Sequence, residues 1–136
     1  MGTTAIALIG LVLWSVLLSF LLVGARASKL LKNEKELNSF QPDGKDLDES
    51  GLRITRAHAN SMEWLILGAS IMLLAIATGN TAITDGLAMY FLYARIAQSV
   101  VHIISTSNLM VAARATFFSI QLIFIMIWAI DLLQLL

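Results

Sequence analysis

Apolar residues gather in four long stretches of this sequence, and most polar residues lie between them. The stretches cover roughly residues 3–25, 57–78, 83–105 and 111–133. Each is long enough for a helix across a bilayer, which requires about 20 mostly apolar residues. The pattern predicts an all-α integral membrane protein: a four-helix bundle of transmembrane helices, in a single domain over residues 1–136.

The longest polar segment, about residues 26–53, separates the first two apolar stretches. It contains the only proline, Pro42, and Gly44, two residue types that favour turns. We therefore expect a solvated loop with a turn from Gln41 to Gly44.

The positions of the basic residues predict how the chain crosses the membrane. Seven of the nine Lys and Arg residues lie between Arg26 and Arg56, whereas residues 78–86 contain none. By the positive-inside rule, the first loop is cytoplasmic and four spans place both chain ends on the other side. The sequence thus predicts a multi-pass protein with a cytoplasmic first loop.

Composition agrees with this fold class and narrows the possible chemistry. Apolar residues make up 58% of the chain, and the mean hydropathy of +0.81 is far above what a soluble core requires. Acidic and basic residues balance at nine each, so no overall field attracts nucleic acid. Because there is no cysteine and only two histidines, we expect no protein thiol nucleophile and no metal site.

Polar side chains inside the predicted spans mark the candidate functional site, because they are costly in lipid unless they face a partner or a wet cavity. In and just before the second span, one stripe of a helix carries Arg53, Arg56, Asn60 and Glu63. In the third span, one stripe carries Arg95, Ser99 and His102, with Gln98 beside it. Two such stripes facing each other would form a polar cleft.

Within this cleft we expect Glu63 and Arg95 to pair. At a rise of 1.5 Å per residue, both lie about 14 to 15 Å from the cytoplasmic ends of their spans. A buried arginine and carboxylate that pair can stay charged where either alone would be costly. The pair could equally serve only to lock two helices together. His58 lies off the stripe, and we interpret it as a contact between helices rather than a catalytic group.

The stripe of the second span lies within a recognisable motif. The segment from Arg53 to Glu63 reads RITRAHANSME, and it resembles the signature of the MAPEG superfamily, the membrane-associated proteins in eicosanoid and glutathione metabolism. A second segment, from Tyr93 through His102 to Arg114, is similar to the bacterial members in particular. The resemblance covers essentially the whole chain and implies a bacterial inner membrane location.

The resemblance implies a homotrimer of left-handed four-helix bundles, with glutathione bound at each subunit interface near the cytoplasmic side. The matching glutathione-binding positions are Arg53, Arg56, Asn60, Glu63 and Arg95, to which the second stripe adds Gln98 and His102. Guanidinium groups can fork onto the carboxylates of this acidic tripeptide, and Glu63 can receive its amino group. Arg114 matches the arginine that stabilises the glutathione thiolate in better-known members, since a nearby cation lowers the pKa of a thiol.

Several positions depart from the members that metabolise eicosanoids. Ala59 stands where several eukaryotic members carry a further arginine, and Phe118 replaces a tyrosine seen in some. Gln98 stands where an aromatic residue or histidine is common, and His102 where a tyrosine is common. The stretch from His102 to Arg114 is also longer than in those members. These departures disfavour an eicosanoid substrate.

The leading hypothesis is a membrane-embedded glutathione transferase or peroxidase that activates the glutathione thiol against a hydrophobic electrophile or a lipid hydroperoxide. Glutathione is the co-substrate, and the expected partners are the hydrophobic substrate, the lipid bilayer and further copies of the chain. A small multidrug-type transporter is one alternative, but it needs a carboxylate deep in the first span, which has none. A non-catalytic MAPEG-like membrane protein that keeps the scaffold is the other.

Overall fold

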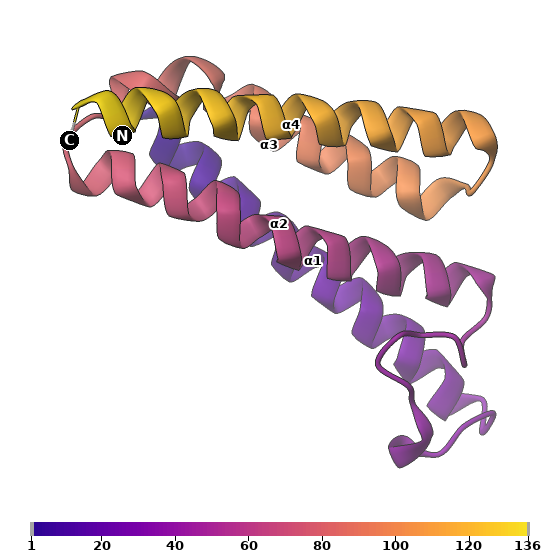
Figure 1. Cartoon of the computed structure of the whole chain (residues 1–136). Helices are drawn as coiled ribbons and strands as arrows, with labels where there is room; N and C mark the ends of the chain where they lie inside the picture. Colours follow the sequence, from indigo (N-terminus) through magenta and orange to yellow (C-terminus); the bar gives the residue numbers. More distant parts are fainter. Residues whose placement is uncertain (1, 136) are drawn as a thin grey trace.

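The computed structural model describes residues 2–135, which form four long helices joined by two tight connections and one longer polar segment (Figure 1). The helices are α1 (Thr3–Leu31), α2 (Glu49–Ala77), α3 (Ala82–Ile104) and α4 (Asn108–Leu135), with a short 3-10 helix, η1 (Leu37–Ser39), before α2. Each long helix has the length and hydropathy needed to cross a membrane. The predicted all-α architecture of four membrane-spanning helices is confirmed.

The first two helices extend well beyond the predicted spans. α1 continues to Leu31 and α2 begins at Glu49, so the connecting segment is shorter than the loop predicted over residues 26–53. Asp48 explains where α2 begins, because its side chain accepts a hydrogen bond from the Gly51 amide at 2.8 Å and caps the helix. Hydropathy marks where contact with lipid ends, whereas helical hydrogen bonding continues into water.

The helices form two pairs that meet at one end of the molecule and separate at the other (Figure 1). α1 packs along α2, α3 packs along α4, and α1 and α2 both contact α3. The two chain ends lie where the pairs meet, and the segment between α1 and α2 lies at the separated end. A buried apolar cluster joins the pairs and contains Ala7, Leu11, Met72, Ala88, Phe91, Leu92 and Trp128.

Glycine at position 68 permits a close approach between α2 and α3. A Cβ atom added at Gly68 would lie 2.7 Å from the ring of Phe91, which is too close for any side chain there. Small residues at helix contacts are common in membranes, where packing rather than the hydrophobic effect holds helices together. The core between the pairs therefore depends on a bare backbone at position 68.

Polar contacts hold the bundle at the end that contains both termini. Gly2 precedes α1 and offers no side-chain cap, and Asp85 of α3 supplies the acceptor instead. Asp85 Oδ1 accepts hydrogen bonds from the Thr4 amide and the Thr4 hydroxyl, both at 2.7 Å. The Thr4 hydroxyl also lies 2.7 Å from the hydroxyl of Thr84. Because a carboxylate is favourable at a helix N-terminus, α3 fixes the start of α1.

The segment between α1 and α2 is held by an ion pair and a turn. Lys35 Nζ lies 2.7 Å from Asp46 Oδ2, and this ammonium lowers the pKa of the Asp46 carboxyl. The Gly44 amide donates to the Gln41 carbonyl at 3.2 Å, which confirms the predicted turn. Gly44 has a φ of 71° and is buried against Thr55, so a residue with a side chain would be both strained and crowded there.

Candidate functional site

A chain of side-chain hydrogen bonds runs across α2, α3 and α4. Arg95 Nη1 and Gln98 Nε2, both from α3, donate to Asn60 Oδ1 of α2 at 3.0 and 3.2 Å. Gln121 of α4 donates from Nε2 to Gln98 Oε1 at 2.8 Å, and to the Phe117 carbonyl at 2.8 Å. The predicted stripes of the second and third spans therefore meet at Asn60, and α4 joins them through Gln121.

Arg95 is a deeply buried cation that forms no ion pair with any residue from 2 to 135. Its side chain is only 2% exposed, and its single side-chain hydrogen bond goes to the neutral amide of Asn60. Within residues 2–135, the second terminal nitrogen, Nη2, is buried and has no hydrogen-bond partner. A buried charge is costly unless it is paired. Arg95 is therefore poised to receive an acceptor from outside the chain.

The expected pair between Glu63 and Arg95 is wrong for the isolated chain. Glu63 is exposed on α2, and Arg95 uses Asn60 instead. On a helix, three residues of separation turn the side chain by about 300°, so Glu63 lies about 60° around α2 from Asn60. That rotation is enough to carry the carboxylate off the face that contacts α3.

Beside the amide chain lies an open hollow of about 180 Å³ between α2, α3 and α4. Its lining consists of Asn60, Gln98, His102, Val111, Arg114, Ala115 and Phe118. Four of these are predicted site residues. Arg114 Nε is buried and has no hydrogen-bond partner among the described residues. The hollow thus presents cationic and amide donors next to apolar side chains, a combination that suits an anionic ligand with an apolar reaction partner.

The other predicted site residues lie outside the lining of this hollow. Arg53 is occupied, because its Nε donates to the Ile103 carbonyl and its Nη1 donates to Glu49, both at 2.8 Å. Arg56 and Glu63 are exposed. Arg56 is nevertheless close enough to the His102 ring to interact with it electrostatically, as Arg114 is.

Sequence reasoning missed Gln121. This side chain is fully buried in a helix that is otherwise apolar over most of its length. An amide in the middle of an apolar span is the signal that could have identified it, since polar groups there are expensive without partners. The expected contact of His58 between helices is confirmed, because its Nε2 lies 3.0 Å from the Ser19 hydroxyl of α1.

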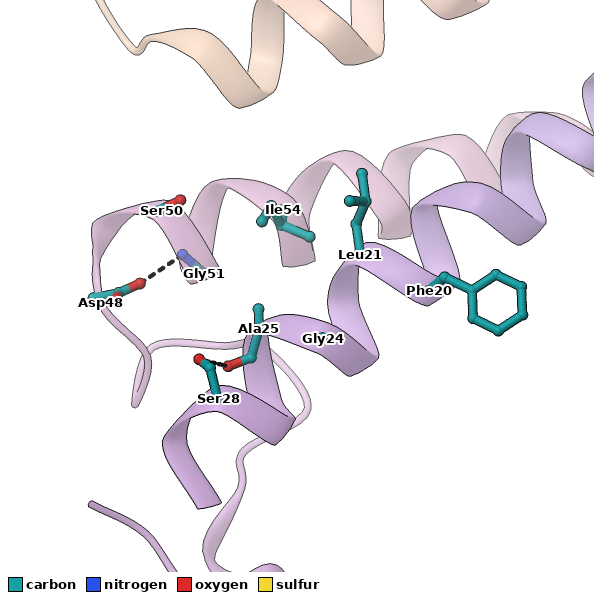
Figure 2. Close-up of a pocket in the computed structure, with 9 residues that line it drawn as sticks. All are labelled: Phe20, Leu21, Gly24, Ala25, Ser28, Asp48, Ser50, Gly51 and Ile54. Atoms are coloured by element: carbon teal, nitrogen blue, oxygen red, sulfur yellow. Dashed lines mark hydrogen bonds between the residues drawn. The ribbon is translucent and has the colours of Figure 1, made fainter. Parts of the chain in front are cut away.

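A second hollow, of about 360 Å³, lies between α1 and α2 at the separated end of the bundle (Figure 2). Two of its polar side chains already bond to the backbone, as Figure 2 shows for Asp48 with the Gly51 amide and for Ser28 with the Ala25 carbonyl. The remaining lining is mostly apolar or glycine. Its one charged side chain, Asp48, is also paired with Lys29, so this hollow is a weaker candidate than the one beside Arg114.

The hollow beside Arg114 offers binding and electrostatics rather than a nucleophile of its own. The chain has no cysteine, and the nearby Ser99 hydroxyl donates to the Arg95 carbonyl at 3.0 Å. Over residues 2–135, no group of three or more His, Cys, Asp or Glu side chains is placed to hold a metal ion. A thiol nucleophile must therefore arrive with a ligand, and a guanidinium can stabilise its anionic form.

Comparison with known proteins gives one match. The model of the MAPEG family matches residues 4–133, nearly the whole chain. No curated protein and no solved structure matches the chain.

Proposed function

Because the chain belongs to the MAPEG family, we propose that it is a membrane-embedded enzyme that binds glutathione and activates its thiol. The observation that carries the proposal is the hollow between α2, α3 and α4, where Arg114 Nε is buried without a partner. The neighbouring Arg95 Nη2 is also without a partner within the described chain. The site therefore has unused donors and no thiol of its own, and glutathione supplies both the acceptors and the thiol.

The proposed ligand set is the one expected from the sequence. It comprises Arg53, Arg56, Asn60, Glu63, Arg95, Gln98 and His102. Asn60, Gln98 and His102 line the hollow, and Arg95 reaches it through Asn60. Arginine suits the two carboxylates of glutathione, because its planar fork can donate two parallel hydrogen bonds to one carboxylate. Exposed Glu63 is available for the ligand's ammonium group.

The chemistry follows from the thiolate. The glutathione thiol gives its proton to water, and Arg114 stabilises the sulfur anion that remains. As a transferase, the protein lets this sulfur form a bond to an electrophilic carbon while the leaving group departs with its electron pair. As a peroxidase, two glutathione molecules reduce a lipid hydroperoxide to the alcohol and water and are oxidised to the disulfide. Apolar Val111 and Phe118 of the hollow suit a substrate dissolved in the bilayer.

The principal alternative is a MAPEG protein that keeps the scaffold without catalysis. Binding and thiolate formation separate the two functions. Purified protein in detergent should bind glutathione in calorimetry and, at neutral pH, develop the ultraviolet absorbance of a thiolate. Binding without thiolate absorbance or conjugation of a hydrophobic electrophile would favour the non-catalytic scaffold, and absence of binding would overturn the proposal.

We further propose that three copies of the chain assemble into a homotrimer. Glu63 and Arg56 lie on α2 and are exposed in the single chain, although charged groups are costly against lipid. Large apolar residues are also exposed along each of the four helices. A neighbouring subunit can cover both kinds of surface. Native mass spectrometry from mild detergent should give three times the mass of 14.9 kDa, and a monomer or dimer alone would contradict the trimer.

The first loop is proposed to lie in the cytoplasm of a bacterial cell, with the protein in the inner membrane. Because the chain has no cysteine, single cysteines introduced as Lys45→Cys and Thr78→Cys report on the two sides without background. Both positions are exposed. A membrane-impermeant maleimide added to intact spheroplasts should label position 78 and spare position 45 until the membrane is opened. The reverse pattern would contradict the orientation.

A further inference from the structure

Gln121 contributes a buried amide that the binding proposal does not use. It lies in the middle of α4, just under four turns from either end, and is fully buried, and its neighbours in sequence are apolar. Burying an amide costs free energy unless it is hydrogen-bonded. Its Nε2 makes two hydrogen bonds at 2.8 Å, to Gln98 Oε1 and to the Phe117 carbonyl.

The Phe117 carbonyl determines which way the Gln121 amide faces. A backbone carbonyl is only an acceptor, so the Gln121 nitrogen must face it. The same nitrogen then faces Gln98, which must present its oxygen in return. Gln98 consequently directs its own nitrogen to Asn60 Oδ1 at 3.2 Å.

Arg95 imposes the same donor-to-acceptor direction from the other end of this series of hydrogen bonds. A guanidinium is only a donor, so Asn60 must present its oxygen to Arg95 Nη1. Two donors converge on that oxygen, and the Asn60 nitrogen is left on the other side of its amide. Asn60 also lines the hollow. The three side-chain amides of this hydrogen-bonded series are thus oriented by a fixed acceptor at one end, the Phe117 carbonyl, and a fixed donor at the other, Arg95.

We infer that Gln121 is a positioning residue which, through Gln98, holds the Asn60 amide with its nitrogen available to an anionic acceptor group of the ligand. This inference rests on the proposed function, in which that acceptor is a carboxylate of glutathione. Gln121 touches no ligand itself. Its effect is to make the inner wall of the hollow a surface of donors, which favours a carboxylate over an ester that carries no charge.

Gln121→Met tests this role, because methionine has a similar volume and cannot donate to Gln98. The matched control is Gln134→Met, which changes an exposed glutamine of the same helix. Gln98→Met breaks the next link of the chain without altering α4, and it serves if Gln121→Met does not fold. Losing one such hydrogen bond is expected to weaken glutathione binding about 5- to 10-fold, whereas Gln134→Met should bind as the wild type does.

The decisive readout is the ratio of affinities for glutathione and for its diethyl ester, in which both carboxylates are blocked. Gln121→Met should lower this ratio about fivefold, because the misoriented Asn60 no longer favours the charged ligand. A purely structural role would weaken both ligands alike and leave the ratio unchanged, which would overturn the inference.

Side-chain amide NMR tests the relay even if glutathione does not bind. In protein labelled with 15N-glutamine, the Gln98 NH2 signals should be protected from solvent exchange in the wild type and in Gln134→Met. They should lose that protection in Gln121→Met. Unchanged Gln98 signals would overturn the relay itself, whereas a working relay without glutathione binding would instead overturn the proposed function.

Discussion

Replacing Arg95 with methionine is expected to stabilise the protein without ligand and to abolish glutathione binding. The guanidinium is 2% exposed, bonds only to a neutral amide and leaves Nη2 without a partner within residues 2–135. Removing a buried charge that lacks a counter-ion relieves a desolvation cost, which we estimate at about 1–3 kcal/mol. Arg95 belongs to the proposed ligand set and also orients Asn60, so its loss should weaken glutathione binding by roughly 2–5 kcal/mol, or at least 30-fold.

Thermal unfolding in detergent and calorimetric titration with glutathione measure these two effects separately. Arg53→Met is the matched control, because Arg53 already donates to Glu49 and to the Ile103 carbonyl. That variant should lose stability, since it removes hydrogen bonds that the chain already makes. If Arg95→Met unfolds at a lower temperature than the wild type, a counter-ion for Arg95 exists in the assembled protein, and the neighbouring subunit's surface is where it must lie.

Helical periodicity was sufficient to predict which faces of the second and third spans meet. Asn60, Gln98 and His102 were selected from spacing alone, and the structure brings all three to one hollow. This succeeded because a membrane span is a regular helix, so residue number translates directly into depth and direction. Arg114 joined the set only through the family resemblance, and it lies in the same hollow.

Periodicity could not predict which pairs of side chains form within that face. Glu63 and Arg95 lie at matching depth, yet Arg95 donates its hydrogen bond to Asn60 instead. A rotation of about 60° around α2 decides which of the two α2 residues faces α3. The role of Gln121 was hidden for a different reason. A single amide in an apolar helix has no periodic pattern, and its hydrogen bonds depend on how α4 packs against α3.

The length of the first two helices was also beyond a hydropathy argument. Residues 26–31 and 49–53 are polar enough to end a membrane span, but they contain no proline, and Asp48 caps α2 from outside the span. Helix propensity and capping determine where the helix begins and ends, whereas hydropathy determines only which part of it lies in lipid. The two boundaries coincide only where a helix breaker stands at the membrane surface.

Arg114→Ala is expected to leave glutathione binding within about threefold of the wild type and to raise the pH at which the bound thiol ionises. Arg114 lines the hollow together with His102, and its Nε is buried without a partner among the described residues. A cation at this position interacts with the thiolate and hardly with the neutral thiol, so it lowers the thiol's pKa. Each unit of pKa corresponds to about 1.4 kcal/mol of preference for the thiolate.

The direction of the pH effect follows from this difference. Because Arg114 lowers the pKa of the bound thiol, the wild type contains thiolate at every pH above that lowered pKa. The variant forms thiolate only at higher pH. We expect a rise of at least about one unit, which reduces the thiolate fraction, and with it the conjugation rate near neutral pH, about tenfold. Thiolate absorbance titrated against pH measures the shift, and at high pH the two curves should converge.

Charge and geometry are separated by two further variants. Arg114→Lys keeps the positive charge and should recover most of the shift, whereas Arg56→Ala removes an exposed cation near His102 and should change it little. If Arg114→Ala titrates as the wild type does, Arg114 only extends toward lipid headgroups, as basic residues near the ends of spans commonly do. If Arg56→Ala shifts the titration instead, the activating charge belongs to α2, and the sulfur lies nearer the rim of the hollow than its floor.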